Sequence, residues 1–221
     1  MDSSTIVAIL FGVALVALVI LGLRRSRRRG TEIRTWARDN GWRYAKSSPP
    51  VNRNWRAPIV RGGSVDHLLW NDFPEGQIFS FENVYRAGAG PALTRNVNGA
   101  DLGAHVPTAL ILPQGHAYKT APKYTPVEFS DGGFNTRWRV LAEQPEEVST
   151  IHELLTPGFR RRLLGNDGLL LIDSPLALED HYLLLVAGGE MQLGNVNPAA
   201  ELLRDLISEL PHPLPQGSPK H

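Results

Sequence analysis

The chain has no cysteine, and lysine occurs only 4 times in its 221 residues. Without cysteine it can form no disulfide, no thiolate nucleophile, no iron–sulfur cluster and no cysteine-ligated zinc site. Arginine outnumbers lysine 19 to 4, a bias typical of a GC-rich coding sequence and therefore of a bacterial source. These shortages remove whole classes of chemistry without favouring a cellular compartment.

The signature motifs of the common enzyme classes are also missing. There is no G-x-x-x-x-G-K-[ST] phosphate loop, no G-x-S-x-G nucleophile elbow and no H-E-x-x-H zinc motif. Gly88-x-Gly90 lacks the third glycine of a dinucleotide fingerprint, and Pro91 follows it directly. The seven histidines are dispersed, at positions 67, 105, 116, 152, 181, 212 and 221. We therefore expect no catalytic residue, no metal and no cofactor. The open enzymatic alternative is a site assembled from residues far apart in the sequence.

Two short polar clusters place an acidic residue next to a histidine, as an acid–base pair in an active site would. Asp66 and His67 are adjacent, and neighbours on a strand point to opposite faces, so a turn and a strand explain them better than an acid–base pair. Glu179-Asp180-His181 precedes an apolar stretch, and loop solvation and capping explain this cluster better than catalysis.

A run without any charged residue, from Ser3 to Leu23, is the most informative positive feature. Its apolar part, Ile6 to Leu23, would span roughly 27 Å as a helix, close to a hydrocarbon core of about 30 Å. A cleaved signal peptide would instead carry positive charge before the run and a small-residue cleavage site after it. The pattern predicts one retained transmembrane helix, within an anchor of residues 1–29.

The orientation of this anchor is predicted by its basic flank, which consists of Arg24, Arg25, Arg27, Arg28 and Arg29. Loops rich in arginine stay on the cytoplasmic side of a membrane. We expect a single-pass protein of the cell membrane, with the N-terminus outside and the C-terminal domain in the cytoplasm. Attraction to anionic headgroups, worth about 1 kcal/mol per residue, would be a by-product of this arrangement.

The span itself offers little beyond tethering to the lipid bilayer. Ala8 and Gly12 form a small-xxx-small pair, which predicts at most a weak homodimer between two spans. No ionisable residue lies within the span, so it cannot by itself form a transport path.

The remainder of the chain is mildly acidic. Residues 31–221 hold 14 Arg and 4 Lys against 21 acidic residues, a net charge of −3. A nucleic-acid partner would require a basic face, so we expect none. The compact basic run of this part is Arg160, Arg161 and Arg162. It is interpreted either as a solvated helix surface or as a contact for an anionic surface, and a lipid-surface sensor is therefore one alternative function.

The pattern of apolar and turn residues predicts an α+β domain over residues 30–210, with a mostly antiparallel sheet and a few packing helices. Val65–Asn71 and Gln77–Arg86 are expected to form a hairpin around Pro74-Glu75-Gly76. Ala87–Ala104 and Gln114–Thr125 have loop-like composition. Further strands are expected at His105–Pro113, Val127–Phe129, Thr136–Leu141, Gly168–Asp173 and His181–Ala187, with Ser174–Asp180 as a connection.

Helices are predicted from their caps and periodicity. Thr31–Asn40 and Pro145–Leu155 each place apolar residues on one face, and a short helix from Thr156 is ended by Gly165. The last helix is expected to be capped by Asn197, with Pro198 in its first position. Residues 211–221 hold four prolines and read as a disordered tail.

Two segments carry a family resemblance. Glu128-Phe129 to Val140 resembles an "eFNxrfrV" pattern, and Trp36-Ala37 to Gly41-Trp42 resembles a "WA…GW" segment. Both are similar to features of uncharacterised bacterial single-span membrane proteins of a domain-of-unknown-function family. The resemblance implies a span, a basic flank and a cytoplasmic domain, and it supplies no catalytic residue. Our leading hypothesis is a non-enzymatic binding or scaffold domain, for a protein partner not yet known, held at the inner face of the membrane.

Overall fold

A computed structural model describes residues 3–47, 55–86, 88–116, 124–165 and 174–215 of the chain. The elements in chain order are α1 (Ser3–Asp39), β1 (Arg43–Ser47), β2 (Ser64–Phe73), β3 (Gly76–Arg86), β4 (Ala92–Pro113), β5 (Thr125–Val127), α2 (Gly132–Arg137), β6 (Trp138–Ala142), the 3-10 helix η1 (Pro145–Glu147), α3 (Val148–Leu154), α4 (Pro157–Leu164), β7 (Leu176–Gly188) and α5 (Leu193–Ser208).

Within these residues, seven strands form one antiparallel sheet in the order β1-β2-β3-β4-β6-β5, and β7 pairs with β4. The long strand β4 is the spine of this sheet. Its first part pairs with β3, from Ala92 to Ala100, and its last part pairs with β6, from Ala109 to Pro113. β7 pairs with β4 from Arg95 to Ile111, with two register shifts. The prediction of an α+β fold with a mostly antiparallel sheet is confirmed.

The predicted hairpin is also confirmed, as β2 and β3. The two strands join at a tight turn in which Phe73 pairs with Gly76. Gly76 has a φ of 137°, and a Cβ at this position would lie 2.6 Å from the carbonyl oxygen of Asp101. Both the backbone conformation and the close approach therefore require glycine.

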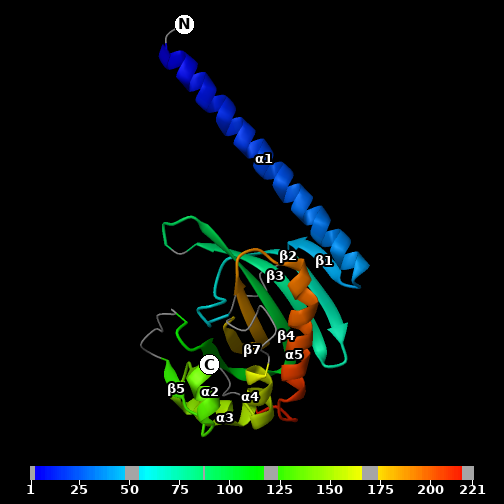
Figure 1. Cartoon of the computed structure of the whole chain (residues 1–221), viewed down its shortest axis with the longest axis vertical. Coiled ribbons are helices and arrows are strands. Elements are labelled where there is room, and N and C mark those ends of the chain that lie inside the picture. Colours follow the sequence, from blue (N-terminus) through cyan, green and yellow to red (C-terminus); the bar gives the residue numbers. More distant parts are fainter. Residues whose placement is uncertain (1–2, 48–54, 87, 117–123, 166–173, 216–221) are drawn as a thin grey trace.

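Apolar side chains cover both faces of the sheet. Helix α5 lies along one face and buries Leu203 and Leu206 there (Figure 1). The opposite face carries an aromatic cluster formed by Trp55, Phe79 and Phe81. The short helices α2, α3 and α4 lie at the end of the sheet opposite to α1 (Figure 1).

Helix α1 is continuous across the expected boundary between anchor and domain at residues 29 and 30. Its last turns bury Ile33 and Ala37 in the core, whereas the rest projects away from the domain (Figure 1). Trp42 is buried beside Trp36, and both rings pack against the core of the domain. Across the described part of the chain, none of the helices combines the length and the apolar character needed to cross a membrane.

The prediction of a loop over Ala87–Ala104 is wrong, because most of this stretch belongs to β4. Small residues occupy this strand where side chains of the neighbouring strands lie directly over its backbone. Gly99 lies beneath Phe79 and Leu184, and a Cβ at this position would be 2.3 Å from the Phe79 ring. Tertiary contacts therefore override the weak strand propensity of glycine and asparagine.

Three other strand predictions need correction. Val127–Phe129 was expected to be a strand, but β5 runs from Thr125 to Val127. Ser174–Asp180 was expected to be a connection, but β7 already begins at Leu176. Thr136–Leu141 was expected to be a strand, but its first two residues end helix α2, whose N-cap Asp131 accepts a hydrogen bond from the Phe134 amide. The predicted strand Gly168–Asp173 lies outside the described residues.

The helix predictions are confirmed except at three places. Thr31 does not begin a helix, because it lies within α1. Thr156 caps α4 and Gly165 ends it, as expected. The segment from Pro145 is divided into η1 and α3. Helix α5 begins at Leu193, so the predicted cap at Asn197 is wrong; the Asn197 amide oxygen instead accepts a hydrogen bond from Trp42 Nε1 at 2.9 Å. Of the predicted tail, residues 211–215 are described, and Leu214 packs against the core.

Candidate functional site

The base of α1 is joined to the sheet through a buried carboxylate. Arg29 Nη2 lies 3.0 Å from Glu82 Oε1 on β3, and the Glu82 side chain is only 8% exposed. The same carboxylate oxygen accepts a hydrogen bond from the Met191 amide at 3.0 Å, and Arg29 also donates to the Met191 carbonyl. Arg29, Glu82 and Met191 are called the α1 junction below. The junction holds the helix, strand β3 and the segment before α5 in one fixed arrangement.

The predicted basic flank is therefore divided between two environments. Arg29 is engaged in the junction and is directed into the domain. Arg24, Arg25, Arg27 and Arg28 are exposed on α1, and Arg25 lies 3.7 Å from Glu190 in a surface ion pair. Four of the five arginines thus remain available at the surface, where an orientation signal would act.

A polar cavity of about 230 Å³ opens beside the α1 junction. The ends of β4 and β7 form one wall, and the segment from Gly188 into the first turn of α5 forms the other. Met191 of the junction lies in this segment between the lining residues Glu190 and Gln192, and is not itself a lining residue. The side chains that line the cavity and carry hydrogen-bonding groups are Asn96, Asn98, Ser174, Glu190, Gln192 and Asn195.

The chemistry of this lining is mostly neutral. Four side-chain amides and one hydroxyl provide both donors and acceptors, and Glu190 is the single ionisable side chain among the lining residues. Asn96 and Asn98 are fixed on the central strand and are almost fully buried. Such a lining suits a neutral, hydroxyl-rich group better than a phosphate, because the cavity wall supplies no cation.

The predicted basic run lies on α4, beside the C-terminal end of α5, and its three side chains lie in different environments. Arg160 is buried; its Nη1 donates to the Leu155 carbonyl, and its guanidinium lies 4.6 Å from the centre of the Phe129 ring. Arg160 is therefore part of the packing between α4 and its neighbours and does not reach the surface.

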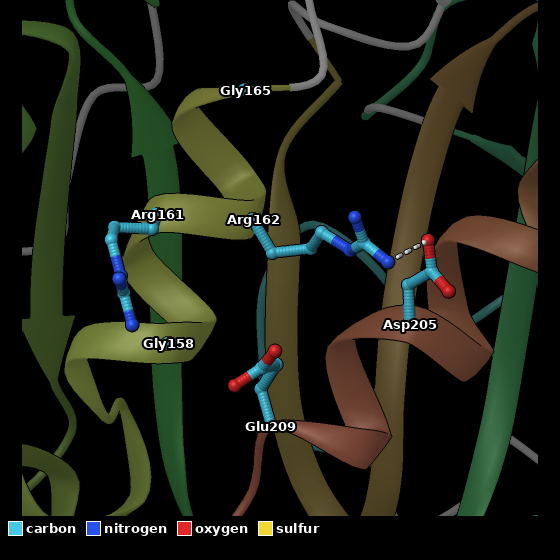
Figure 2. A pocket seen from close by; sticks show the side chains of 6 residues that line it. All are labelled: Gly158, Arg161, Arg162, Gly165, Asp205 and Glu209. Carbon is cyan, nitrogen blue, oxygen red and sulfur yellow. Dashed lines mark ion pairs between the residues drawn. The ribbon is translucent and has the colours of Figure 1, made fainter.

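Arg161 and Arg162 line a larger cavity of about 380 Å³ between α4 and α5. Figure 2 shows that Arg162 reaches across to Asp205, with which it forms a 2.9 Å ion pair, whereas the Arg161 side chain extends away from Asp205. Glu209 also lines the cavity. Two cations and two carboxylates thus compensate one another, so this cavity offers little net attraction to an anionic surface.

His67 and Glu179 have structural roles. The interpretation of Glu179-Asp180-His181 as a solvated loop is wrong, because these residues lie within β7. His67 Nδ1 lies 3.0 Å from the Tyr44 hydroxyl, and the two rings stack, which connects β2 to β1. Glu179 is fully buried, and its carboxylate accepts a 2.7 Å hydrogen bond from the Ala57 amide. The predicted homodimer through Ala8 and Gly12 stays a prediction, because the surroundings of the Ala8 side chain lie outside the described residues.

Sequence reasoning singled out Arg29 as part of an orientation signal, but it missed its junction partners Glu82 and Met191 and the residues of the neutral cavity. A carboxylate within the β-favouring run Ile78–Tyr85 was the available signal for Glu82, because a charge within such a strand is costly unless it is paired. Asn96 and Asn98 lie in the stretch whose composition indicated a loop.

Comparison with known proteins yields a fold relationship. No protein-family model and no curated protein matches the chain. Among solved structures, the chain is similar to the mycobacterial trehalose monomycolate transport factor A, TtfA, with a TM-score of 0.58 and 11% sequence identity. The alignment covers 85% of this chain and 98% of that one. At this identity the likeness shows that the two proteins share a fold.

Proposed function

We propose that this chain is a membrane-tethered, non-enzymatic binding domain that assists the handling of an envelope glycolipid at the inner face of the membrane. Its neutral cavity would bind the hydroxyl-rich head of that lipid, and α1 would hold the domain at the bilayer. The observation that carries this proposal is the position of the cavity next to the α1 junction: Glu190 and Gln192 line the cavity and flank Met191, whose amide donates to Glu82. Any group bound there would be held next to the base of the tether.

Three lines support tethering by α1. The sequence from Ile6 to Leu23 holds no charged residue. Where α1 projects from the domain, large apolar side chains are exposed, with Phe11 at 71% and Leu21 at 60%. Such exposure is unfavourable in water and favourable in lipid. The exposed arginines that follow would favour a cytoplasmic position for the domain.

The glycolipid specificity is supported by the cavity and by the shared fold. The cavity combines amide and hydroxyl groups with a single carboxylate, the groups that suit the hydroxyls of a sugar. The solved structure of similar fold is a transport factor for trehalose monomycolate, a lipid whose name denotes a sugar head. The proposal for this chain concerns a lipid of that chemical class and not one particular molecule.

The lack of cysteine allows a direct test of the tether and its orientation. Ser3→Cys and Ser47→Cys each introduce one thiol into the full chain. We expect an impermeant maleimide to label position 3 in intact cells, and to label position 47 only after the membrane is opened. Labelling of position 47 in intact cells would contradict the orientation. Recovery of the full chain in the soluble fraction would contradict the tether.

Binding is tested with a matched pair of glycine variants. Gly188 lines the cavity and Gly194 does not, and a Cβ at either position would meet no atom within 4 Å. We expect Gly188→Leu to weaken binding of a trehalose-headed glycolipid in micelles by at least about tenfold, equivalent to ~1.4 kcal/mol. Gly194→Leu should bind as the unmodified chain does. Equal binding of the glycolipid by both variants would refute the cavity as the binding site. So would tighter binding of the unmodified chain to micelles that lack the glycolipid than to micelles that contain it.

A further inference from the structure

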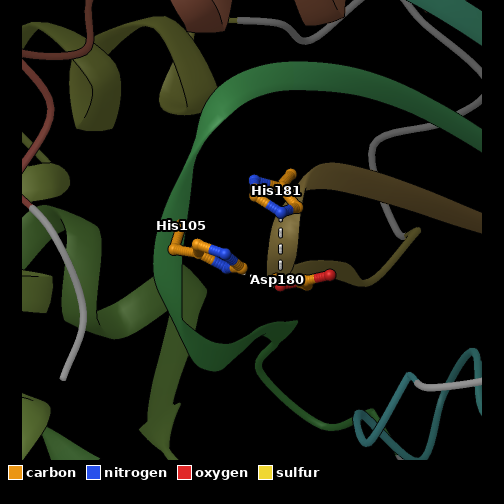
Figure 3. A group of neighbouring side chains, drawn as sticks. All are labelled: His105, Asp180 and His181. Atoms are coloured by element: carbon orange, nitrogen blue, oxygen red, sulfur yellow. Dashed lines mark ion pairs between the residues drawn. The ribbon is translucent and has the colours of Figure 1, made fainter. Parts of the chain in front are cut away.

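A cluster of metal-ligating side chains lies where β4 and β7 lose their regular register. Asp101 pairs with Tyr182, but the next pair along is Val106 with Asp180, so β4 carries three more residues than β7 in this interval. The resulting bulge places His105 of β4 beside Asp180 and His181 of β7 (Figure 3). Residues that are 75 positions apart in the sequence thus meet at one point.

The backbone at Asp180 explains how two adjacent residues of a strand can face the same point. Asp180 has a φ of 58°, the left-handed conformation that side-chain-bearing residues adopt only sparsely. In an extended strand, Asp180 and His181 would point to opposite faces. The left-handed residue interrupts this alternation and lets both side chains approach His105. The strain of this conformation is consistent with a functional role for the turn.

The three donor atoms lie close enough together to surround one metal ion, and the closest two are within hydrogen-bond distance of each other. His105 Nδ1 lies 2.7 Å from Asp180 Oδ1, and His181 Nε2 lies 3.7 Å from the same oxygen. All three donor atoms lie within 4.8 Å of one another. Zinc–ligand bonds of 2.0–2.2 Å in a tetrahedron place neighbouring donors about 3.3–3.6 Å apart. Small rotations of the side chains would therefore complete the geometry.

The site is also accessible. The His105 side chain is 67% exposed, and the side chains of Asp180 and His181 are each 34% exposed. The two imidazole rings lie with their centres 3.8 Å apart. The ligands come from two neighbouring strands and not from a single loop. A dissolved ion can reach this point without any opening of the domain.

We propose that His105, Asp180 and His181 form a binding site for a divalent transition metal, with Zn²⁺ as the preferred ion. Two imidazole nitrogens and one carboxylate oxygen suit Zn²⁺, whereas Mg²⁺ and Ca²⁺ prefer sites made of oxygen alone. Three protein ligands leave a fourth position for water or for an external ligand. The bound ion would also join the β4 bulge to β7. This inference does not depend on the proposed glycolipid binding.

The proposal is tested on the untagged full chain after removal of metals by a chelator. Calorimetric titration with ZnCl₂ should show one site per chain. His105→Ala and His181→Ala should each weaken binding by at least about tenfold, since loss of even a supporting partner of a ligand costs 10–100-fold. His152→Ala removes an exposed histidine from another part of the domain and should leave binding unchanged. Weakening by His152→Ala to the same extent, or retention of binding by the double variant at 105 and 181, would overturn the proposal.

A further variant separates loss of a ligand from loss of the fold. Asp180→Gly removes the carboxylate while permitting the left-handed backbone. We expect this variant to keep the circular dichroism spectrum of the unmodified chain and to lose Zn²⁺ binding. With Co²⁺ as the probe, the unmodified chain should develop the visible absorption of a low-coordinate site, and Asp180→Gly should not. The same Co²⁺ spectrum in both proteins would exclude Asp180 as a ligand.

Discussion

Arg29 of α1 and Glu82 of β3 form an ion pair in which Arg29 Nη2 lies 3.0 Å from Glu82 Oε1. The carboxylate is almost fully buried, while the Arg29 side chain keeps 21% of its exposure. Glu82 therefore has a partner for its charge, and the base of α1 has a fixed position on the domain. One arginine of the predicted orientation signal thus serves the fold.

Loss of the Glu82 carboxylate should destabilise the domain. Glu82→Gln leaves the largely buried Arg29 charge with only the more distant, exposed Glu32 as a partner, and we expect a loss of about 2–4 kcal/mol in the free energy of unfolding. Glu190→Gln removes the partner of the exposed Arg25 and should cost less than about 1 kcal/mol. Urea unfolding of the full chain, followed by tryptophan fluorescence, measures both. Equal losses in the two variants would show that burial does not distinguish these pairs.

The arginine run should separate into structural and surface members. Arg160→Ala removes a hydrogen bond to the Leu155 carbonyl and the contact with the Phe129 ring, and should cost about 2–3 kcal/mol. Arg161→Ala, one residue along on the exposed side, should change stability by no more than about 0.5 kcal/mol. The same unfolding measurement applies. A larger effect at Arg161 than at Arg160 would be inconsistent with the observed burial.

Gly99 is a tightly packed position of the sheet. Gly99→Ala would place a methyl group against the Phe79 ring and Leu184, and we expect this crowding to cost about 1–3 kcal/mol. Gly188→Ala, near the end of the paired strand β7, meets open space and should be nearly neutral. Thermal unfolding distinguishes them. A neutral Gly99→Ala would mean that the two packed faces can shift more than the close contacts indicate.

The pKa of Glu75 is held below its usual value, first by its hydrogen bonds with Arg204. A carboxyl whose pKa is lowered on folding contributes stability above its unfolded pKa, and this contribution is lost as the pH falls through the folded value. We expect Arg204→Gln to return the Glu75 pKa toward its ordinary value, as followed by carbon NMR of the side chain. The loss of stability in Arg204→Gln should shrink in acid. No movement of the Glu75 resonance would exclude the pairing.

Local features were predictable where the chemistry of one segment is decisive. The turn before Gly76 and the caps at Thr156 and Gly165 each act over a few residues, and the elements that they bound were predicted correctly. Apolar periodicity likewise identified most of α5, although its first turn was missed because Pro198 is tolerated inside the helix.

The missed features depend on partners far along the chain. Glu82 pairs with a residue 53 positions away, and Gly99 is a strand residue only because Phe79 and Leu184 fill the space above it. Asp180 and His105 meet through a bulge, whose position is set by the register of two long strands. No local pattern encodes such a register, so neither the neutral cavity nor the histidine cluster could be derived from the sequence.

Because α1 is one uninterrupted helix, the rotation of the domain relative to the apolar part of α1 is fixed. With the apolar run held in a bilayer as proposed, each residue inserted between Leu23 and Arg29 would lift the domain by about 1.5 Å and turn it by about 100°. One added residue would therefore rotate the neutral cavity about the axis of α1, whereas four would return it to within about 40° of its original orientation. The number of residues between the tether and the junction thus sets both the distance of the domain from the bilayer and its rotation about the axis of α1. A partner in the same membrane would therefore meet the domain from one side only.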